Sequence, residues 1–336
     1  MRMVLLKVED LSVHYKIYGN WVRAVDDVSI ELDSGETLGL VGESGSGKST
    51  LAYAITQLLP NNAYIKKGKI IFNDQDLFKY TLKPDGTLNV YDENIRKIRW
   101  KEISMIFQAS LNAFNPVYKV GDQIKEAILA HEPDMSEEEL ERRVIELYDF
   151  VGIPRDRINN YPHEYSGGMK QRAMIAMALA LRPKLVLADE PTTAVDVITQ
   201  DRILKEIIDL QKKLGMAMIL ITHDVSVVAE VSHKIAVMYA GQVVEKGTTR
   251  EVFKHYAHPY TEGLLNSFPN LFGEKKRLSF IPGSPPDLAN PPKGCRFHPR
   301  CPYAREICAE QSPPLIEISP GHYSACHFAT SIYGGK

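Results

Sequence analysis

Strand-like and helix-like hydrophobic patterns alternate along the chain from Val4 to about Tyr256. Short runs of consecutive apolar residues predict fully buried strands at 37–41, 184–188 and 216–221. Strands that alternate with helical segments favour an α/β layered domain with a mainly parallel sheet. Polar residues follow each of the three runs, so we expect the chemistry of the protein at the C-terminal ends of these strands.

Two further stretches complete the predicted organisation. Residues 109–182 have helical periodicity and include an acidic helix at 136–148, which predicts a helical insert between the first two strands. From about Asn266 onward proline and glycine become frequent, as is typical of a linker or an irregular appended unit. The predicted boundary lies near residue 262. It separates a main domain, 1–262, from a small irregular unit, 263–336.

The overall composition is that of a protein that folds in water. The chain has 336 residues, 44% of them apolar and 24% charged, and this length favours a main domain with a smaller second unit. The longest clean apolar stretch, 173–181, is too short to span a bilayer, and the N-terminus lacks the features of a signal peptide. We therefore expect a cytosolic protein. A net charge of -2 without a dense basic run gives no reason to expect a nucleic-acid partner.

The strongest local motif is a glycine-rich segment between the first buried strand and a helical run that ends before Pro60. It fits G-x-x-x-x-G-K-[ST] and consists of Gly42, Glu43, Ser44, Gly45, Ser46, Gly47, Lys48, Ser49 and Thr50. Glycines let backbone N–H groups curl toward a phosphate, and the helix presents its positive N-terminal end. We expect Lys48 to reach the β and γ phosphates of a nucleoside triphosphate and Ser49 to bind Mg²⁺. The alternative is a glycine- and serine-rich turn that meets the pattern by chance.

Two adjacent carboxylates close the second buried strand. Asp189 and Glu190 follow the apolar run 185–188, and we expect them at the sheet edge where the phosphate loop also emerges. Asp189 would hold Mg²⁺, and Glu190 would polarise the attacking water as a general base. Taken alone, an acidic pair after a strand is often only the cap of a loop. The phosphate loop upstream favours the catalytic interpretation.

A further segment, Tyr165-Ser166-Gly167-Gly168-Met169-Lys170-Gln171-Arg172, resembles the signature of ATP-binding-cassette ATPases. The resemblance covers about residues 4–260 and extends, in the family's order and spacing, to Gln108, Asp196 and His223. It implies a RecA-like core with an antiparallel β-subdomain and a helical subdomain at about 109–182. In this family two domains meet head to tail. Ser166, Gly167 and Gly168 of one would then close over the nucleotide held by the other, and free N–H groups before a helix suit that role.

The resemblance also implies roles for single residues. Gln108 would bind Mg²⁺ and sense movement of an attached membrane subunit, and Asp196 would belong to the nucleotide site. His223 would contact the γ-phosphate and help to orient the hydrolytic water. Adenine is normally held by an aromatic ring upstream of the phosphate loop. The candidates are Tyr15, which fits the family's pattern best, Tyr18 and Trp21.

Three segments resemble those of dipeptide and oligopeptide permease ATPases: 107–116, His258-Pro259-Tyr260 and 282–286. This branch implies a peripheral subunit on the cytoplasmic side of the cell membrane, whose ATP hydrolysis drives peptide uptake through two transmembrane permease subunits contacted near 108–116. A second ATPase subunit, usually a paralogue, would complete the dimer, and an extracytoplasmic binding protein would deliver the cargo. Related systems carry oligosaccharides or nickel. A soluble ATPase of the same family without a membrane partner is the other alternative.

The chain departs from the family's common pattern at three places: Met169, Val195 and an extension at 80–94. None of these changes removes a charged catalytic group. The extension contains a Pro-Asp-Gly turn and is predicted to be a surface hairpin. Because Glu190 and His223 are both present, a nucleotide-binding module without turnover is disfavoured.

All four cysteines fall near the C-terminus, with the spacing C-x5-C-x6-C-x17-C: Cys295, Cys301, Cys308 and Cys326. Two disulfides are not expected in a cytosolic chain, except in a hyperthermophile, so a metal is the favoured cross-link for this proline-rich unit. Zinc sites usually contain closely spaced C-x2-4-C pairs, whereas iron–sulfur clusters accept wider spacing. The resemblance implies a [4Fe-4S] cluster at these positions. Zn²⁺ and four free thiols remain the alternatives.

Overall fold

The computed structural model describes residues 3–107, 113–191, 205, 207–209, 211–267 and 280–333. The chain divides into two compact units. Unit 1 comprises 1–90 and 220–336, and unit 2 comprises 91–219, so the division falls within β8 (Ala217–Ile221). Unit 1 therefore contains both the segment with the phosphate motif and the C-terminal segment with the cysteines.

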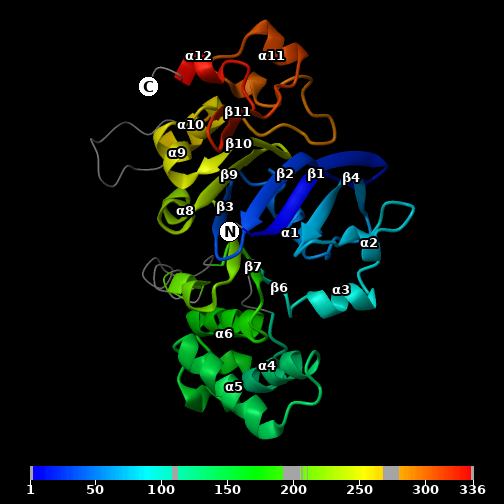
Figure 1. Cartoon of the computed structure of the whole chain (residues 1–336), viewed down its shortest axis with the longest axis vertical. Coiled ribbons are helices and arrows are strands. Elements are labelled where there is room, and N and C mark those ends of the chain that lie inside the picture. The colour runs from blue at the N-terminus through cyan, green and yellow to red at the C-terminus, as the bar shows by residue number, and fades with distance from the viewer. Residues whose placement is uncertain are drawn as a thin grey trace. The chain divides into compact units, whose positions relative to one another are not determined.

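An antiparallel sheet forms one layer of unit 1, with the strand order β2-β1-β4-β5 (Figure 1). Its strands are β1 (Val4–Ile17), β2 (Asn20–Asp33), β4 (Ala63–Phe72) and β5 (Gln75–Asp76). Along β1 the buried positions change from Leu6 and Val8 to Leu11 and Val13, across a register shift between Val8 and Leu11. An irregularity of this kind inserts a residue and returns the apolar side chains to the buried face. The expected antiparallel β-subdomain is thereby confirmed.

A second sheet in unit 1 contains the strand that leads into the phosphate loop. Within the unit its order is β11-β12-β10-β9-β3. The strands are β3 (Thr37–Val41), β9 (Lys234–Tyr239), β10 (Gln242–Thr248), β11 (Ile316–Ser319) and β12 (His322–Ser324). β3 and β9 are parallel, and the other neighbours are antiparallel. All of β3 is buried, as its continuous apolar run predicts.

The hairpin of β11 and β12 was not predicted by the sequence, which indicated only an irregular C-terminal unit. β12 pairs with β10 through Glu245–Ser324 and Lys246–Tyr323. The hairpin therefore covers an edge of the β10 strand that would otherwise expose unpaired backbone groups. Its strands are only four and three residues long, and although β11 (Ile-Glu-Ile-Ser) alternates apolar and polar residues, so short a pattern does not indicate its partner strand.

Short helices surround the two sheets of unit 1. They are α1 (Lys48–Ile55), α2 (Phe78–Thr81), α8 (Val225–Val231), α9 (Thr249–Lys254), α10 (Pro259–Asn266), α11 (Glu306–Glu310), α12 (Ala329–Tyr333) and a 3₁₀ turn (His298–Arg300). α1 begins at Lys48 and ends before Pro60, as predicted. The extension at 80–94 forms the predicted hairpin, because Leu82 and Leu88 make an antiparallel bridge.

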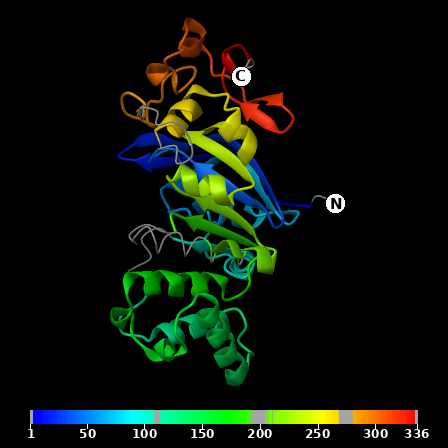
Figure 2. The same ribbon diagram turned by 90° about the vertical axis from the view of Figure 1, so that its left-hand side faces the viewer.

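Unit 2 combines a parallel strand pair with a group of helices. Its elements are α3 (Glu93–Ile98), β6 (Ile103–Ile106), α4 (Val120–Leu129), α5 (Glu137–Phe150), α6 (Gly167–Leu179) and β7 (Leu185–Asp189), with 3₁₀ turns at Arg155–Asn159 and Pro162–Glu164. β6 and β7 are parallel, and α4, α5 and α6 pack against one another (Figures 1 and 2).

The predicted acidic helix of unit 2 is α5. The Ser136 hydroxyl accepts a hydrogen bond from the backbone N–H of Glu139, and the glutamates of the first turn favour the positive helix end. In the described part of the chain, no helix is both long and apolar enough to cross a membrane.

Candidate functional site

The phosphate loop connects β3 to α1, as the motif predicts. Gly42 has a φ of +153° and Gly47 a φ of +103°. A Cβ atom at Gly42 would lie 2.1 Å from the carbonyl oxygen of Met238, and one at Gly47 would lie 2.1 Å from that of Ala24. Any side chain at these two positions would collide with neighbouring backbone. The curled form of the loop therefore requires glycine at both.

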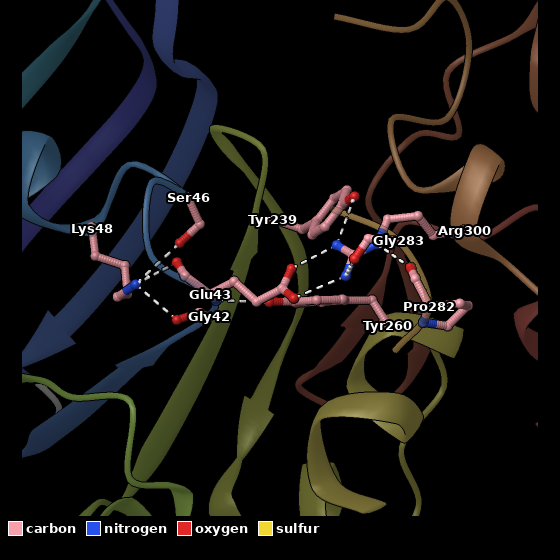
Figure 3. A network of polar contacts seen from close by, with 9 residues as sticks. All are labelled: Gly42, Glu43, Ser46, Lys48, Tyr239, Tyr260, Pro282, Gly283 and Arg300. Carbon is pink, nitrogen blue, oxygen red and sulfur yellow. Dashed lines mark hydrogen bonds and ion pairs between the residues drawn. The ribbon is translucent and has the colours of Figure 1, made fainter. Parts of the chain in front are cut away.

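Lys48 is the buried cation of this loop. Its Nζ donates hydrogen bonds to the carbonyl oxygens of Gly42 and Glu43, both at 2.8 Å, and lies 3.2 Å from Ser46 Oγ (Figure 3). The side chain thus folds back over the loop that it follows. An ammonium group beside a glycine-rich loop and a helix N-terminus has the chemistry to bind phosphate.

Tyr15 of β1 lies beside the helix that follows the loop. Its hydroxyl is 3.3 Å from Oγ1 of Thr50, and the ring is partly buried. Tyr18 is fully exposed, and Trp21 packs edge-on against Tyr64 with ring centroids 5.0 Å apart. Of the three candidates for adenine stacking, Tyr15 is the one whose described hydrogen bond reaches the phosphate-loop segment.

Replacing Tyr15 with alanine is expected to weaken MgATP binding about 10-fold, because stacking of an aromatic ring on a base contributes ~1–3 kcal/mol. Titration calorimetry would measure the dissociation constant. Tyr15→Phe keeps the ring but loses the hydroxyl near Thr50, and it should bind MgATP nearly as well as the natural protein. Tyr18→Ala is the matched control on the exposed turn. An unchanged affinity in Tyr15→Ala would contradict the assignment.

In unit 2 the two carboxylates lie where the sequence placed them, at the end of β7. Asp189 is 2% exposed and is the last residue of the strand. Glu190 follows with a φ of +46°, in the left-handed region. A non-glycine residue in this region is uncommon, and such residues cluster at functional sites. The backbone turn therefore leaves Asp189 buried and Glu190 partly exposed.

The signature segment forms the N-terminus of α6. The Ser166 hydroxyl accepts a hydrogen bond from the backbone N–H of Met169 at 3.3 Å, and the two glycines that follow begin the helix. Tyr165 is 5% exposed, and its hydroxyl lies 2.8 Å from that of Tyr148. The buried tyrosine anchors the segment, while Ser166 and Gly167 are exposed. The first N–H groups of the helix thus lie where an anion could reach them.

Three further predicted site residues are His223, Gln108 and Asp196. His223 follows β8 and is exposed, directly before the Asp224 cap of α8. Gln108 and Asp196 lie outside the described residues. In unit 1, Lys48 contacts the phosphate loop and Tyr15 contacts Thr50 of the helix that follows the loop. The assembly of all the predicted groups into one catalytic site stays a prediction.

A contact that the sequence analysis missed joins the phosphate loop to the C-terminal segment (Figure 3). Nη1 and Nη2 of Arg300 donate to the two carboxylate oxygens of Glu43 at 2.7 and 2.9 Å, and the backbone N–H of Glu43 donates to the hydroxyl of Tyr260 at 2.8 Å. A carboxylate inside an anion-binding motif is a signal that a counter-charge is required. Nothing local indicates which of the 40 lysines and arginines supplies it.

The four cysteines line one cavity of unit 1. Cys295, Cys301, Cys308 and Cys326 share it with Phe297. None of the four forms a disulfide. Burial raises the pKa of Cys295 and of Cys301 to about 11, so both thiols are neutral near pH 7 unless a metal displaces their protons. Among the described residues, no group of three or more His, Cys, Asp or Glu could hold a metal ion.

Models of two known protein families match this chain. The model of the ABC transporter family matches residues 25–193, and that of the oligopeptide/dipeptide transporter C-terminal region matches residues 244–308. The dimeric ATP-binding cassette MJ0796, in a post-hydrolysis state bound to ADP and Pi, is similar in fold, with a TM-score of 0.63 and 27% identity over 73% of this chain and 99% of that chain. The fold and the phosphate loop thus define an ABC ATPase, which hydrolyses ATP.

Curated relatives extend the likeness to nearly the whole chain. The chain is 49% identical over 323 residues to the oligopeptide transport ATP-binding protein OppD of Bacillus subtilis (strain 168), covering 95% of this chain and 87% of that protein. It is 44% identical over 322 residues to the dipeptide transport ATP-binding protein DppD of Lactococcus lactis subsp. cremoris (strain MG1363), covering 95% and 89%. The chain belongs to the ABC transporter ATPases, in the branch with the oligopeptide/dipeptide transporter C-terminal region. The resemblance predicted from the sequence is confirmed.

Proposed function

We propose that this chain is the ATP-hydrolysing subunit of an importer for dipeptides or oligopeptides. The observation that carries this proposal is the C-terminal match over residues 244–308, in a chain whose relatives along almost its entire length are peptide-transport ATP-binding proteins. The chain works as a peripheral subunit at the cytoplasmic side of the membrane. Two transmembrane permease subunits contact it near 108–116, and an extracytoplasmic binding protein supplies the peptide.

A second ATPase subunit, a paralogue of this chain, completes a head-to-tail dimer. The signature segment of each subunit, which in this chain is Ser166, Gly167 and Gly168, closes over the nucleotide held by the phosphate loop of the other. The exposed N-terminus of α6 supports this role, because its free N–H groups can bind a phosphate oxygen. ATP binding closes the dimer, and hydrolysis with product release opens it. This cycle drives the permease subunits between their inward- and outward-facing states.

Within each site the phosphate loop and Lys48 hold the β and γ phosphates. Ser49, Gln108 and Asp189 would hold Mg²⁺, which would supply positive charge that offsets the negative charge of the phosphates. Water attacks the γ phosphorus and passes a proton to the Glu190 carboxylate, and ADP leaves with the electrons of the broken bond.

Three further residues complete the proposed site. His223 orients the attacking water near the γ-phosphate, and Asp196 contributes to the nucleotide site. Tyr15 stacks on adenine, which its position beside Thr50 supports. Proper positioning of these groups accounts for most of the rate in phosphoryl transfer.

Transport assays would test the proposed cargo. The tagged chain is purified from detergent-solubilised membranes of its own cells, together with the subunits that accompany it, and the complex is placed in lipid vesicles with its binding protein. We expect ATP-dependent uptake of labelled dipeptides or oligopeptides, and none without ATP. Uptake of nickel or an oligosaccharide instead would replace the cargo assignment. Failure to recover any membrane subunit would favour the soluble ATPase.

We also propose that the four cysteines hold a [4Fe-4S] cluster with a structural role. Zinc sites built from cysteines usually contain closely spaced C-x2-4-C pairs, which are missing from this segment. Instead all four thiols line one cavity, which suits a cluster with one thiolate for each iron. Such a cluster would tie the 3₁₀ turn, α11 and the last segment of the chain together. Zinc and four free thiols remain the alternatives that metal analysis would separate.

A further inference from the structure

Glu43 is held through all three of its polar groups (Figure 3). Its backbone N–H donates to the Tyr260 hydroxyl, and its carbonyl oxygen accepts a hydrogen bond from Lys48, each at 2.8 Å. Both oxygens of its carboxylate accept hydrogen bonds from Arg300, at 2.7 and 2.9 Å. The second residue of the phosphate loop is therefore positioned by α1, by α10 and by the 3₁₀ turn at the same time.

The Arg300 guanidinium is itself fixed from several sides. Nε donates to the carbonyl oxygen of Pro282 at 2.7 Å, and Nη1 also lies 3.2 Å from the hydroxyl of Tyr239. The Arg300 side chain is 6% exposed, and the side chain of Glu43 is 27% exposed. A partly buried, bidentate pair of this kind has a specific geometry that lysine cannot reproduce. Removing Arg300 would leave the Glu43 carboxylate partly buried without this partner.

The charge of Glu43 gives this pair a direct connection to nucleotide binding. A carboxylate inside a loop that binds a triphosphate repels the ligand, because both are negative. Figure 3 shows the Glu43 side chain extending toward Arg300, on the side away from Lys48. Arg300 thus both neutralises the carboxylate and holds it away from the lysine that would bind the phosphates.

The residues that hold Glu43 are continuous with the segment that carries the cysteines. Arg300 ends the 3₁₀ turn (His298–Arg300) and directly precedes Cys301. Phe297, from the same segment, packs against Tyr260 and Tyr239 with ring centroids 5.4 and 5.2 Å apart. Phe297 also lines the cysteine cavity. The two tyrosines that contact the Glu43–Arg300 pair are thus packed on one wall of that cavity.

We propose that Arg300 is a positioning residue for the phosphate loop of its own chain, and that it maintains ATP affinity by pairing with Glu43. The C-terminal segment that carries the cysteines would then be part of the nucleotide site and would have more than a structural role. This inference rests on ATP binding at the phosphate loop.

The test is titration calorimetry of the full-length chain with the Mg²⁺ complex of adenylyl imidodiphosphate, a poorly hydrolysed ATP analogue. Arg300→Ala is expected to weaken binding about 10-fold, within the usual range for coupling between two sites. Arg300→Lys should give an intermediate loss of affinity, because lysine keeps the positive charge but cannot make the bidentate contact of the guanidinium group. In steady-state hydrolysis, KM for ATP should rise by a similar factor while kcat changes less than about twofold.

A second substitution separates positioning from general structural damage. If Arg300 acts by neutralising Glu43, then Glu43→Gln should restore most of the affinity lost in Arg300→Ala, because the unpaired charge is gone. Lys234→Ala is the matched control. Lys234 forms a partly buried ion pair with Asp33 and Glu36, at the opposite end of β3 from the phosphate loop, and its loss should leave affinity unchanged.

The inference would be overturned by an unchanged affinity in Arg300→Ala, by equal losses in Arg300→Ala and Lys234→Ala, or by no recovery with Glu43→Gln. If Arg300→Ala does not fold, as judged by its melting transition, the comparison of Arg300→Lys with Arg300→Lys/Glu43→Gln gives the same test. The natural chain is measured in the same series. A natural chain that fails to bind the analogue would contradict the nucleotide site itself. If the natural chain and Arg300→Ala both bind it normally, only the role of Arg300 is contradicted.

Discussion

Replacing Glu190 with glutamine is expected to lower steady-state ATP hydrolysis by roughly 10²–10⁴-fold, the usual contribution of a general base. The amide has nearly the same shape as the carboxylate but cannot accept the proton of the attacking water. Binding of MgATP should remain, because Lys48 and the glycines that are proposed to hold the phosphates are unchanged. Phosphate release measures the first effect, and titration calorimetry measures the second.

Glu138→Gln is the matched control for this experiment, since Glu138 is an exposed glutamate in the first turn of α5. It should hydrolyse ATP at the natural rate. Equal hydrolysis by Glu190→Gln and by the natural chain would remove Glu190 from the catalytic site. The left-handed backbone at Glu190 would then need a purely structural explanation.

Replacing Cys301 with serine is expected to abolish the proposed cluster. The natural chain, purified without oxygen, should contain about four irons with matching acid-labile sulfide, and the variant should contain few or none. Loss of a structural metal removes a cross-link from a segment with little apolar core. The melting midpoint should therefore fall by about 10 °C.

Ser331→Ala provides the control, because Ser331 is exposed on α12 in the same C-terminal segment and its hydroxyl donates to a nearby carbonyl oxygen, that of Phe328. It should retain both iron and stability. A natural chain that contains one zinc ion, or no metal, would contradict the cluster proposal. The assignment as an ABC ATPase would be unaffected, since it depends on motifs outside the cysteine segment.

The features that could be predicted from the sequence are those whose residues are contiguous. β3, the phosphate loop and α1 occupy 37–55 without interruption, and there the apolar run, the glycines and the helix start all act locally. The same holds for α5 with its Ser136 cap and for the strand that ends on Asp189. Gln108, Asp196 and the boundary near residue 262 stay predictions.

Only the tertiary structure decided which distant residues meet. The sequence left three rings open for adenine, and the contact of Tyr15 with Thr50 favours one of them. Glu43 and Arg300 are 257 positions apart, and no local pattern pairs them. The choice depends on β12 joining β10 and on the packing of Phe297, which together bring the C-terminal segment back to the loop. The sequence by itself thus determined the ATPase chemistry and its local framework, whereas the attachment of the cysteine segment to the phosphate loop required long-range packing that has no local signal.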